Sequence, residues 1–320
     1  MKLFLLALLA LTAQAATPIL LFTDIVSGPA AGGEGGNGSF VCLYGVFGGS
    51  GYVTLNGAAT IPKIWQPGVA GGDLRLDKVC VQIGAKTSSG NLVLTAPSGV
   101  SNPLPFVVAS GNIYFVSTTG SDSGAGTFAA PWRSMLKARN TMAPGDITYV
   151  RSGAGQMADD GSGWSTSLLL DANAGTATAP KAFVVYPGES ATIGSITSGM
   201  GIRSKGNGNS FWVFAGFSML GSSVALNTYD DAGWRIVGND MTCPNGNAQA
   251  GCLDLGGSGK STGHVIYGNS IHDVGTNNVP TTVTALYHGI YLSETNSAID
   301  FGYNTVARVF GGRCIQQHVN

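Results

Sequence analysis

Charged side chains are scarce in this chain. Asp, Glu, Lys and Arg make up 10% of its 320 residues, against roughly 25% in an average soluble domain. The basic residues number 16 and the acidic residues 17, so the net charge is −1. So little positive charge argues against nucleic acid and against an anionic membrane surface as partners.

Long hydrophobic runs are also missing beyond the N-terminus. The first 15 residues contain Lys2, the apolar run Leu3–Leu11 and the small-residue site Ala13–Ala15. This pattern predicts a secretory signal peptide that is cleaved before Ala16. The run is too short to cross a bilayer, which takes about 20 residues, and no later run is long enough either. We therefore expect an exported protein, extracellular or periplasmic, without a membrane span.

Cysteine is sparse, with five residues, and an oxidising compartment favours their pairing. Cys42 and Cys80 lie in strand-like runs and could bridge two sheets of an N-terminal domain. Cys243 and Cys252 flank a Gly- and Asn-rich loop that a disulfide would close. Cys314 is left over, and residue 320 falls inside an apparent coil. We therefore expect a chain truncated at its C-terminal end, with the partner of Cys314 and further coils beyond that point.

Glycine, in contrast, is abundant: 49 of 320 residues, about twice the usual share. With 44% hydrophobic residues, this composition indicates a folded all-β protein with many tight turns. In residues 16–110, short apolar runs alternate with turn residues, which favours an immunoglobulin-like β-sandwich. The runs are Phe40–Tyr44, Tyr52–Leu55, Lys78–Ile83, Asn91–Thr95 and Phe106–Val108.

This N-terminal segment resembles the IPT/TIG family of immunoglobulin-like domains. The resemblance is carried by Gly38–Gly45, Val53–Gly57, Ser89–Thr95 and Val100–Val108. It implies a spacer or a carbohydrate-associated module rather than a catalytic domain. The boundary to the second domain is expected near Ser110.

Two kinds of short strand recur in residues 111–320. In the first, an Asn follows a short apolar strand and an apolar residue comes two positions later: Trp234–Met241, His264–Ile271 and Ile299–Val306. The second is Ala225–Thr228, Cys252–Leu255, Gly289–Leu292 and Cys314–Gln317. Recurrence in a fixed order at intervals of roughly 25 to 37 residues indicates a solenoid. Because the strands are short and punctuated by Gly and Asn, we predict a right-handed parallel β-helix.

The start of this domain resembles the opening of pectate-lyase-like right-handed β-helix proteins. The resemblance lies in Ile113–Thr127, Ala130–Arg139 and Ala143–Val150. It implies a short amphipathic helix, with Trp132 and Met135 on its apolar face, that covers the first coil. The first coil strand is then expected at Ile147–Val150. The family also implies an extracellular polysaccharide as the ligand.

Alternation of side chains along each strand predicts which residues face the core. The inward set is Leu253, Leu255, Ile290, Leu292 and Ile315. The residues between them form an outward column: Asn227, Asp254, Tyr291 and Gln316. A separate asparagine ladder (Asn239, Asn269 and Asn304) is expected at a turn, where stacked amides bond coil to coil.

The family resemblance implies removal of a proton next to a uronate carboxylate, with Ca²⁺ or a cationic side chain neutralising that carboxylate. We take His288, Arg313 and Tyr291 as candidate catalytic residues. If coils stack in register, His288 and Arg313 lie one strand spacing apart, about 4.8 Å. The alternative is that His288 is a hydrogen-bonded turn residue packed beneath the next coil.

The candidate substrate-binding residues are Asp254, Lys260, Glu294, Gln316 and His318. Asp254 beside Asn227 could instead be a Ca²⁺ ligand or a solvated surface carboxylate. The sequence contains no cluster of acids on adjacent coils, so we assign no metal site and keep Ca²⁺ only as an alternative cofactor. His272-Asp273 could be an acid–base pair, although a turn is favoured.

These features predict a secreted monomer that binds and degrades an extracellular polysaccharide. β-Elimination by a polysaccharide lyase is expected for an acidic polymer, and glycoside hydrolysis is the other enzymatic reading. The non-catalytic alternative is an adhesion protein with a β-helix stalk that binds glycans. Ionisable side chains that converge near His288 would favour an enzyme, whereas ladders of Asn, Ser, Thr and Gly would favour a stalk.

Overall fold

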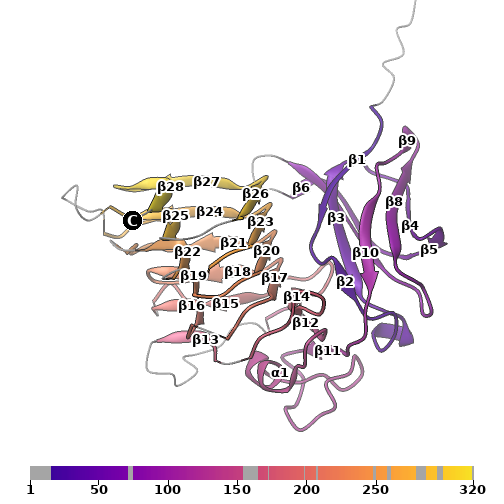
Figure 1. Ribbon diagram of the computed structural model, residues 1–320, viewed down its shortest axis with the longest axis horizontal. Coiled ribbons are helices and arrows are strands. Elements are labelled where there is room, and N and C mark those ends of the chain that lie inside the picture. The colour runs from indigo at the N-terminus through magenta and orange to yellow at the C-terminus, as the bar shows by residue number, and fades with distance from the viewer. Residues whose placement is uncertain are drawn as a thin grey trace, which may run out of the picture.

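A computed structural model describes residues 16–70, 75–153, 165–171, 173–197, 199–206, 208–247, 250–257, 261–278, 286–293 and 298–318. The predicted signal peptide, Lys260 and Glu294 lie outside the described residues. The chain forms an N-terminal β-domain beside a stack of parallel β-coils (Figure 1).

Two sheets build the N-terminal domain, as the alternating pattern predicts. The first has the order β1 (Ile19–Thr23), β3 (Phe40–Val46), β7 (Leu76–Gln82) and β6 (Ile61–Ala70). The second has the order β2 (Ser27–Gly28), β10 (Leu104–Val108), β8 (Gly90–Ala96), β4 (Tyr52–Leu55) and β5 (Ala58–Ala59), and β9 (Gly99–Val100) pairs with β8. A 3-10 turn, η1 (Glu34–Gly36), precedes β3. The immunoglobulin-like fold of this domain and its membership in the IPT/TIG family stay predictions.

Both predicted disulfides form, but one joins different elements than expected. Cys42 and Cys80 are directly opposite each other on the neighbouring strands β3 and β7. The expectation that they bridge two sheets is therefore wrong, because paired positions of adjacent antiparallel strands place both side chains on one face of one sheet. Cys243 and Cys252 close the predicted loop, and Cys314 is exposed without a disulfide.

Three parallel sheets make up the β-helix, and from residue 181 onward each coil contributes one strand to each of them. The first helix sheet contains β11 (Ile113–Val116), β12 (Ile147–Val150), β14 (Lys181–Val185), β17 (Trp212–Ala215), β20 (Arg235–Val237), β23 (Val265–Tyr267) and β26 (Asp300–Gly302). The second contains β13 (Thr166–Leu170), β16 (Met200–Ser204), β19 (Val224–Tyr229), β22 (Gly251–Gly256), β25 (His288–Ser293) and β28 (Arg313–His318). The third contains β15 (Thr192–Gly194), β18 (Ser218–Leu220), β21 (Asp240–Thr242), β24 (Ser270–Val274) and β27 (Thr305–Val309). The predicted parallel β-helix is confirmed by this pairing.

The predicted stacking of the core is also confirmed. Leu253, Ile290 and Ile315 are register partners on β22, β25 and β28. Leu253 and Ile290 are fully buried, whereas Ile315 on the last strand is 46% exposed. Burial of such a stack, at about 25 cal/mol per Å² of apolar area, is the main force that holds coil to coil.

The asparagine ladder forms as predicted at the turn between the first and third helix sheets. Asn239 Nδ2 donates to Asn269 Oδ1 at 3.1 Å, and Asn269 Nδ2 donates to Asn304 Oδ1 at 2.9 Å. Each of the three amides also donates to a backbone carbonyl of the preceding coil, and the backbone N–H groups of Asn239 and Asn269 donate to Oδ1 of the asparagine on the next coil. Every buried polar group at this turn is thereby satisfied.

The predicted cap is present, with two corrections. Trp132, which was expected on the apolar face of the helix, lies before the helix and forms a bridge with Val116. Helix α1 (Met135–Thr141) begins after Ser134, whose side chain accepts the Lys137 N–H, and it buries Met135. Asp122 fixes this start by accepting N–H groups of Ser134 and Arg133. The expectation that Ile147–Val150 is the first coil strand is wrong, because β11 pairs with it in parallel on the capping side.

The N-terminal domain covers the outer face of the first helix sheet (Figure 1). Tyr149 Oη donates to Phe40 O at 2.7 Å, and Arg235 donates to the carbonyls of Thr23 and Asp24. One shared core includes Phe40, Phe115, Tyr149, Val184, Val213 and Val237. Because the shared core is apolar, the two parts are held as one unit rather than joined by a spacer. This face of the β-helix is therefore covered by the N-terminal domain.

Candidate functional site

The outward column lies on the second helix sheet in the predicted register. Asn227 pairs with Asp254, Asp254 with Tyr291, and Tyr291 with Gln316. Arg203 on β16 extends the column by one coil, because it is the register partner of Asn227. Arg203 was not predicted as part of the column. The signal that could have identified it is the side-chain alternation of β16, continued in register one coil before Asn227.

Asp254 has the most perturbed acidity in this column. Asn227 Nδ2 donates to Asp254 Oδ2 at 2.7 Å. Burial raises the pKa of Asp254 from 3.8 to about 7, although the hydrogen bond from Asn227 acts in the opposite direction. The side chain remains partly exposed. A carboxyl group that titrates near neutral pH and reaches the surface can accept and release protons during a reaction.

The predicted His288–Arg313 pair is also in register, on β25 and β28. His288 is only 5% exposed. Burial, followed by the Arg313 charge, lowers its pKa below 6.5, so the imidazole is neutral at pH 7. Its Nδ1 is buried and has no hydrogen-bond partner among the described residues.

An aromatic stack joins His288 to the exposed end of the column. The rings of His288 and Tyr291 are 5.3 Å apart and nearly parallel, and those of Tyr291 and His318 are 6.4 Å apart. Tyr291 is partly exposed and His318 is exposed, whereas His288 lies beneath them. Gln316 Nε2 donates to the Gln317 carbonyl. Buried His288 is therefore connected to this surface by its ring contact with Tyr291.

His272 and Asp273 belong to a different surface, on the third helix sheet. His272 Nδ1 lies 2.7 Å from Asp273 Oδ2, and His272 Nε2 lies 2.8 Å from Asp240 Oδ1. Arg308 makes two bonds to Asp273. Asp273 has a φ of 56° at the end of its strand. These contacts connect three successive coils along the third helix sheet. The favoured turn interpretation is wrong, because His272 and Asp273 both lie within strand β24.

A Ser–His contact in the helix core has the wrong tautomer for nucleophilic catalysis. Ser261 Oγ lies 2.9 Å from His264 Nε2, and His264 Nδ1 accepts the backbone N–H of Trp234. Burial lowers the pKa of His264 to about 4, so the ring is neutral and carries its hydrogen on Nε2. Nε2 then donates to Ser261 and cannot take its proton. Both side chains are at most 1% exposed.

The residues that the structure describes contain no group of three or more His, Cys, Asp or Glu side chains arranged to hold a metal ion. Ca²⁺ takes six to eight oxygen ligands, and at Asp254 the neighbouring Asn227 presents its N–H rather than its oxygen. This donor set does not fit Ca²⁺.

Within the described parts of the chain, no helix is long and apolar enough to cross a bilayer.

The chain matches no family model, and no curated protein matches it. Among solved structures it is similar to one described as the crystal structure of pectate lyase Pel9A, with 15% identity over 59% of this chain and a TM-score of 0.39. It spans about half of that protein, 46%. A rhamnogalacturonan lyase is 14% identical over 65% of this chain and 67% of its own, with a TM-score of 0.29. The β-helix assignment therefore rests on the strand pairing and not on these overlaps.

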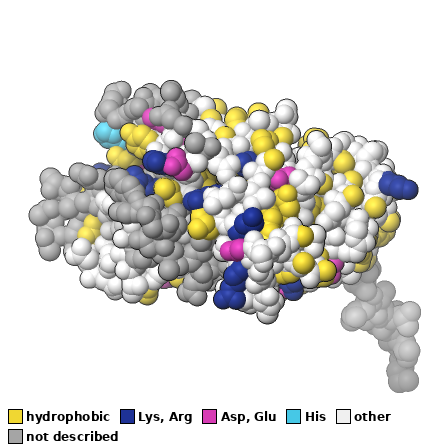
Figure 2. Space-filling model, turned by 90° about the horizontal axis from the view of Figure 1, so that it is seen from below, with side chains coloured by type: hydrophobic (Ala, Val, Ile, Leu, Met, Phe, Trp, Pro, Cys, Tyr) yellow, Lys and Arg dark blue, Asp and Glu magenta, His cyan; other side chains and the backbone are white. Residues whose placement is uncertain are grey.

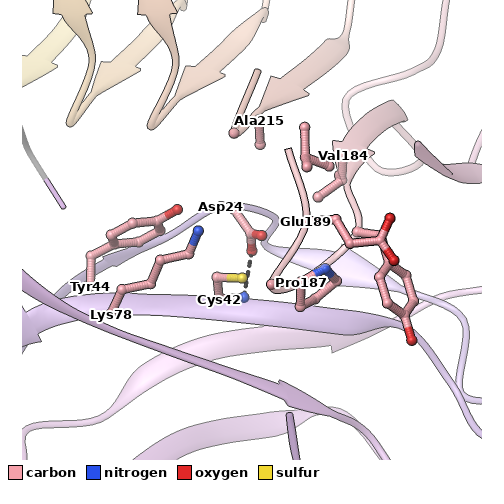
Figure 3. A pocket seen from close by; sticks show the side chains of 12 residues that line it. Asp24, Cys42, Tyr44, Lys78, Val184, Pro187, Glu189 and Ala215 are labelled. Carbon is pink, nitrogen blue, oxygen red and sulfur yellow. Dashed lines mark hydrogen bonds between the residues drawn. The ribbon is translucent and has the colours of Figure 1, made fainter. Parts of the chain in front are cut away.

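A small cavity of roughly 30 Å³ lies between the two domains and provides a contrast to the outward column (Figure 3). Asp24 points into it beside Lys78 and Tyr44. Its Oδ1 accepts the N–H groups of Ile25 and Cys42, each at 2.8 Å, and burial raises its pKa to about 6. Because its partners are backbone groups at the domain interface, Asp24 has a structural role.

Charge on the molecular surface is mixed in sign. On the face shown in Figure 2, Lys and Arg side chains are interspersed with Asp and Glu side chains. A ligand would therefore be selected by the local groups of a site rather than by a broad field.

Proposed function

We propose that this protein is an exported polysaccharide-degrading enzyme that works on the outer face of the second helix sheet. The observation that carries the proposal is Asp254, a partly exposed carboxyl whose pKa is raised to about 7. It lies in register with Asn227 on one side and with Tyr291 on the other. Export is supported by the predicted signal peptide and by two disulfides.

The chemistry that fits best is β-elimination on a uronate-containing chain. Ionised Asp254 takes the proton from the carbon next to the uronate carboxyl group. The electron pair of that C–H bond forms a C=C double bond, the C–O bond to the neighbouring sugar breaks, and the departing oxygen takes up a proton. Arg313 supplies positive charge near the sugar carboxylate, and the rings of Tyr291 and His318 offer a flat surface against which a sugar ring can pack.

Elimination is favoured over hydrolysis by the neighbours of Asp254 on the column. Glycoside hydrolysis uses a pair of carboxyl groups about 5 to 10 Å apart. In the described part of the second helix sheet, the ionisable residues on the strands after Asp254 are His288, Tyr291, Arg313, Cys314 and His318, and none of them carries a carboxyl group. This set matches a proton acceptor with a cationic partner.

The test is digestion of a panel of acidic and neutral polysaccharides by the full chain. Elimination creates an unsaturated product that absorbs near 235 nm, whereas hydrolysis creates reducing ends without that absorbance. We expect 235-nm absorbance on a uronate polymer and its loss in Asp254→Asn. Asp171→Asn is the matched control, because this carboxylate is 50% exposed in a surface ion pair with Lys205.

Each other outcome assigns a different function. Reducing ends without absorbance would replace elimination by hydrolysis. Binding of a polysaccharide without any cleavage would favour the adhesion protein. Full activity of Asp254→Asn would remove Asp254 from the mechanism.

A further inference from the structure

The two oxygens of the Asp254 carboxyl group have different surroundings. Oδ2 accepts the Asn227 Nδ2–H at 2.7 Å. We infer that Asn227 is a positioning residue that holds Oδ2 and leaves Oδ1 as the oxygen that exchanges a proton with the substrate. This inference rests on the proposed function, because it concerns the group that we propose to react.

The backbone of the second helix sheet fixes this contact. Asn227 and Asp254 are directly paired on β19 and β22, and strands in a sheet lie about 4.8 Å apart. Asn227 is also held from the other side by its pairing with Arg203 on β16. Both side chains are short, so few rotamers are open to them. Asn227 is only 8% exposed, so water competes weakly for its amide.

The direction of the hydrogen bond follows from the chemistry of the two groups. An ionised carboxylate can only accept, so the amide must present Nδ2 to it. When Asp254 takes up a proton, the oxygen already engaged by Asn227 is the less available one, and the O–H bond forms at Oδ1. In the elimination step, the electron pair of Oδ1 takes the substrate proton while Oδ2 stays bound to Asn227.

Asn227 should also set the pH at which Asp254 ionises. A donor to a carboxylate stabilises the ionised form and lowers the pKa. At Asp254 this acts against burial, which alone would keep the group neutral to a higher pH. Removal of the donor should therefore raise the pH at which Asp254 becomes a base.

The direct test is a carbon-13 NMR titration of the Asp254 carboxyl group in the full chain, assigned by its loss in Asp254→Asn. Asn227→Leu removes the donor at similar volume, and Asn227→Gln keeps an amide on a longer stem. We expect the midpoint to rise by about one unit or more in Asn227→Leu and to return toward the wild-type value in Asn227→Gln. Asn227→Ala serves if the leucine variant does not fold.

The control is Asn245→Ala. Asn245 Nδ2 makes a coil-to-coil bond to Ser222 Oγ at 2.7 Å, and neither residue belongs to the outward column. A general loss of coil packing would shift the Asp254 midpoint in this variant too, whereas a positioning role leaves it unchanged. An unchanged midpoint in both Asn227→Leu and Asn227→Ala overturns the inference.

The pH profile of cleavage separates this inference from the proposed function. With Asp254 as the base, activity rises with pH through its pKa, and Asn227→Leu should move this rise to higher pH with little change in KM. If Asp254→Asn is fully active, the proposed function fails, and the NMR midpoints still decide whether Asn227 holds the carboxylate. If Asp254 is essential and the profile of Asn227→Leu matches the wild type, the positioning role alone fails.

Discussion

Asp254 should destabilise the folded protein at the pH where it is expected to work. Its folded-state pKa of about 7 lies above the unfolded value of 3.8. Below pH 3.8 the group is neutral in both states and costs nothing. Between these two pKa values the unfolded state ionises while the folded state keeps its proton, so stability falls from about pH 4 to about pH 7 and stays low above that. A shift of about three units corresponds to about 4 kcal/mol as an upper limit, because the side chain is partly exposed.

Asp254→Asn should therefore raise the free energy of unfolding by up to about 4 kcal/mol at pH 8 and change it little at pH 4. The amide oxygen of the new residue still accepts from Asn227, so the hydrogen bond persists. Urea denaturation of both proteins at the two pH values measures the difference. Asp171→Asn is the control: its exposed ion pair with Lys205 should be worth at most about 1 kcal/mol. No gain at pH 8, or an equal gain at both pH values, would refute the raised pKa.

Three further predictions concern the scaffold. Asn269→Ala should lower the free energy of unfolding, measured by urea denaturation, by about 3 kcal/mol or more, because it removes hydrogen bonds from several buried groups. Asn304→Ala should lower it by less, because that side chain is only part-buried. Equal losses in the two variants would contradict the ladder. Replacing Cys243 and Cys252 together by Ser should cost about 2 to 3 kcal/mol for a loop closed over 9 residues, and an unchanged denaturation midpoint would speak against this bond. Tyr149→Phe should lower the free energy of unfolding by about 1 to 3 kcal/mol, because the buried Phe40 carbonyl loses its hydrogen-bond donor at the domain interface. Because that interface holds the two domains together, calorimetry should show them unfolding in one transition rather than two.

The coil architecture could be predicted because its signals are local and repeated. Each Asn of the ladder follows the same short apolar strand, so the repeat itself fixes the register that pairs Asn239 with Asn269. The alternation of Leu253, Asp254 and Leu255 likewise assigns an inner and an outer face without knowledge of the rest of the chain.

The domain interface could not be predicted, because its contacts join segments far apart in sequence. Tyr149 and Phe40 are separated by 109 residues, and nothing in either segment specifies the other. The strands of the first helix sheet have the same apolar sequence pattern whether a loop or a second domain covers the sheet. The expectation that the Cys42–Cys80 disulfide bridges two sheets was wrong for a related reason, since strand order within the N-terminal sheet is not visible from the alternation of side chains.

The position of several candidate residues could be predicted, but the proposed catalytic role of Asp254 and its electrostatics could not. Register placed Asp254, Tyr291 and Arg313 correctly on the second helix sheet. The pKa of Asp254 depends on how deeply its neighbours bury it, and the sequence does not contain that quantity. His288 is buried because it lies two residues before Ile290, so both side chains point to the core side of the strand. This agrees with the alternative interpretation that His288 packs beneath the next coil.

The most direct test of the account is a crystal structure of Asp254→Asn with a uronate oligosaccharide bound. The account predicts a sugar lying across β22 and β25, with a ring against Tyr291 and the reacting carbon within hydrogen-bond reach of residue 254. An oligosaccharide bound away from the second helix sheet, with no sugar within reach of residue 254, would contradict it.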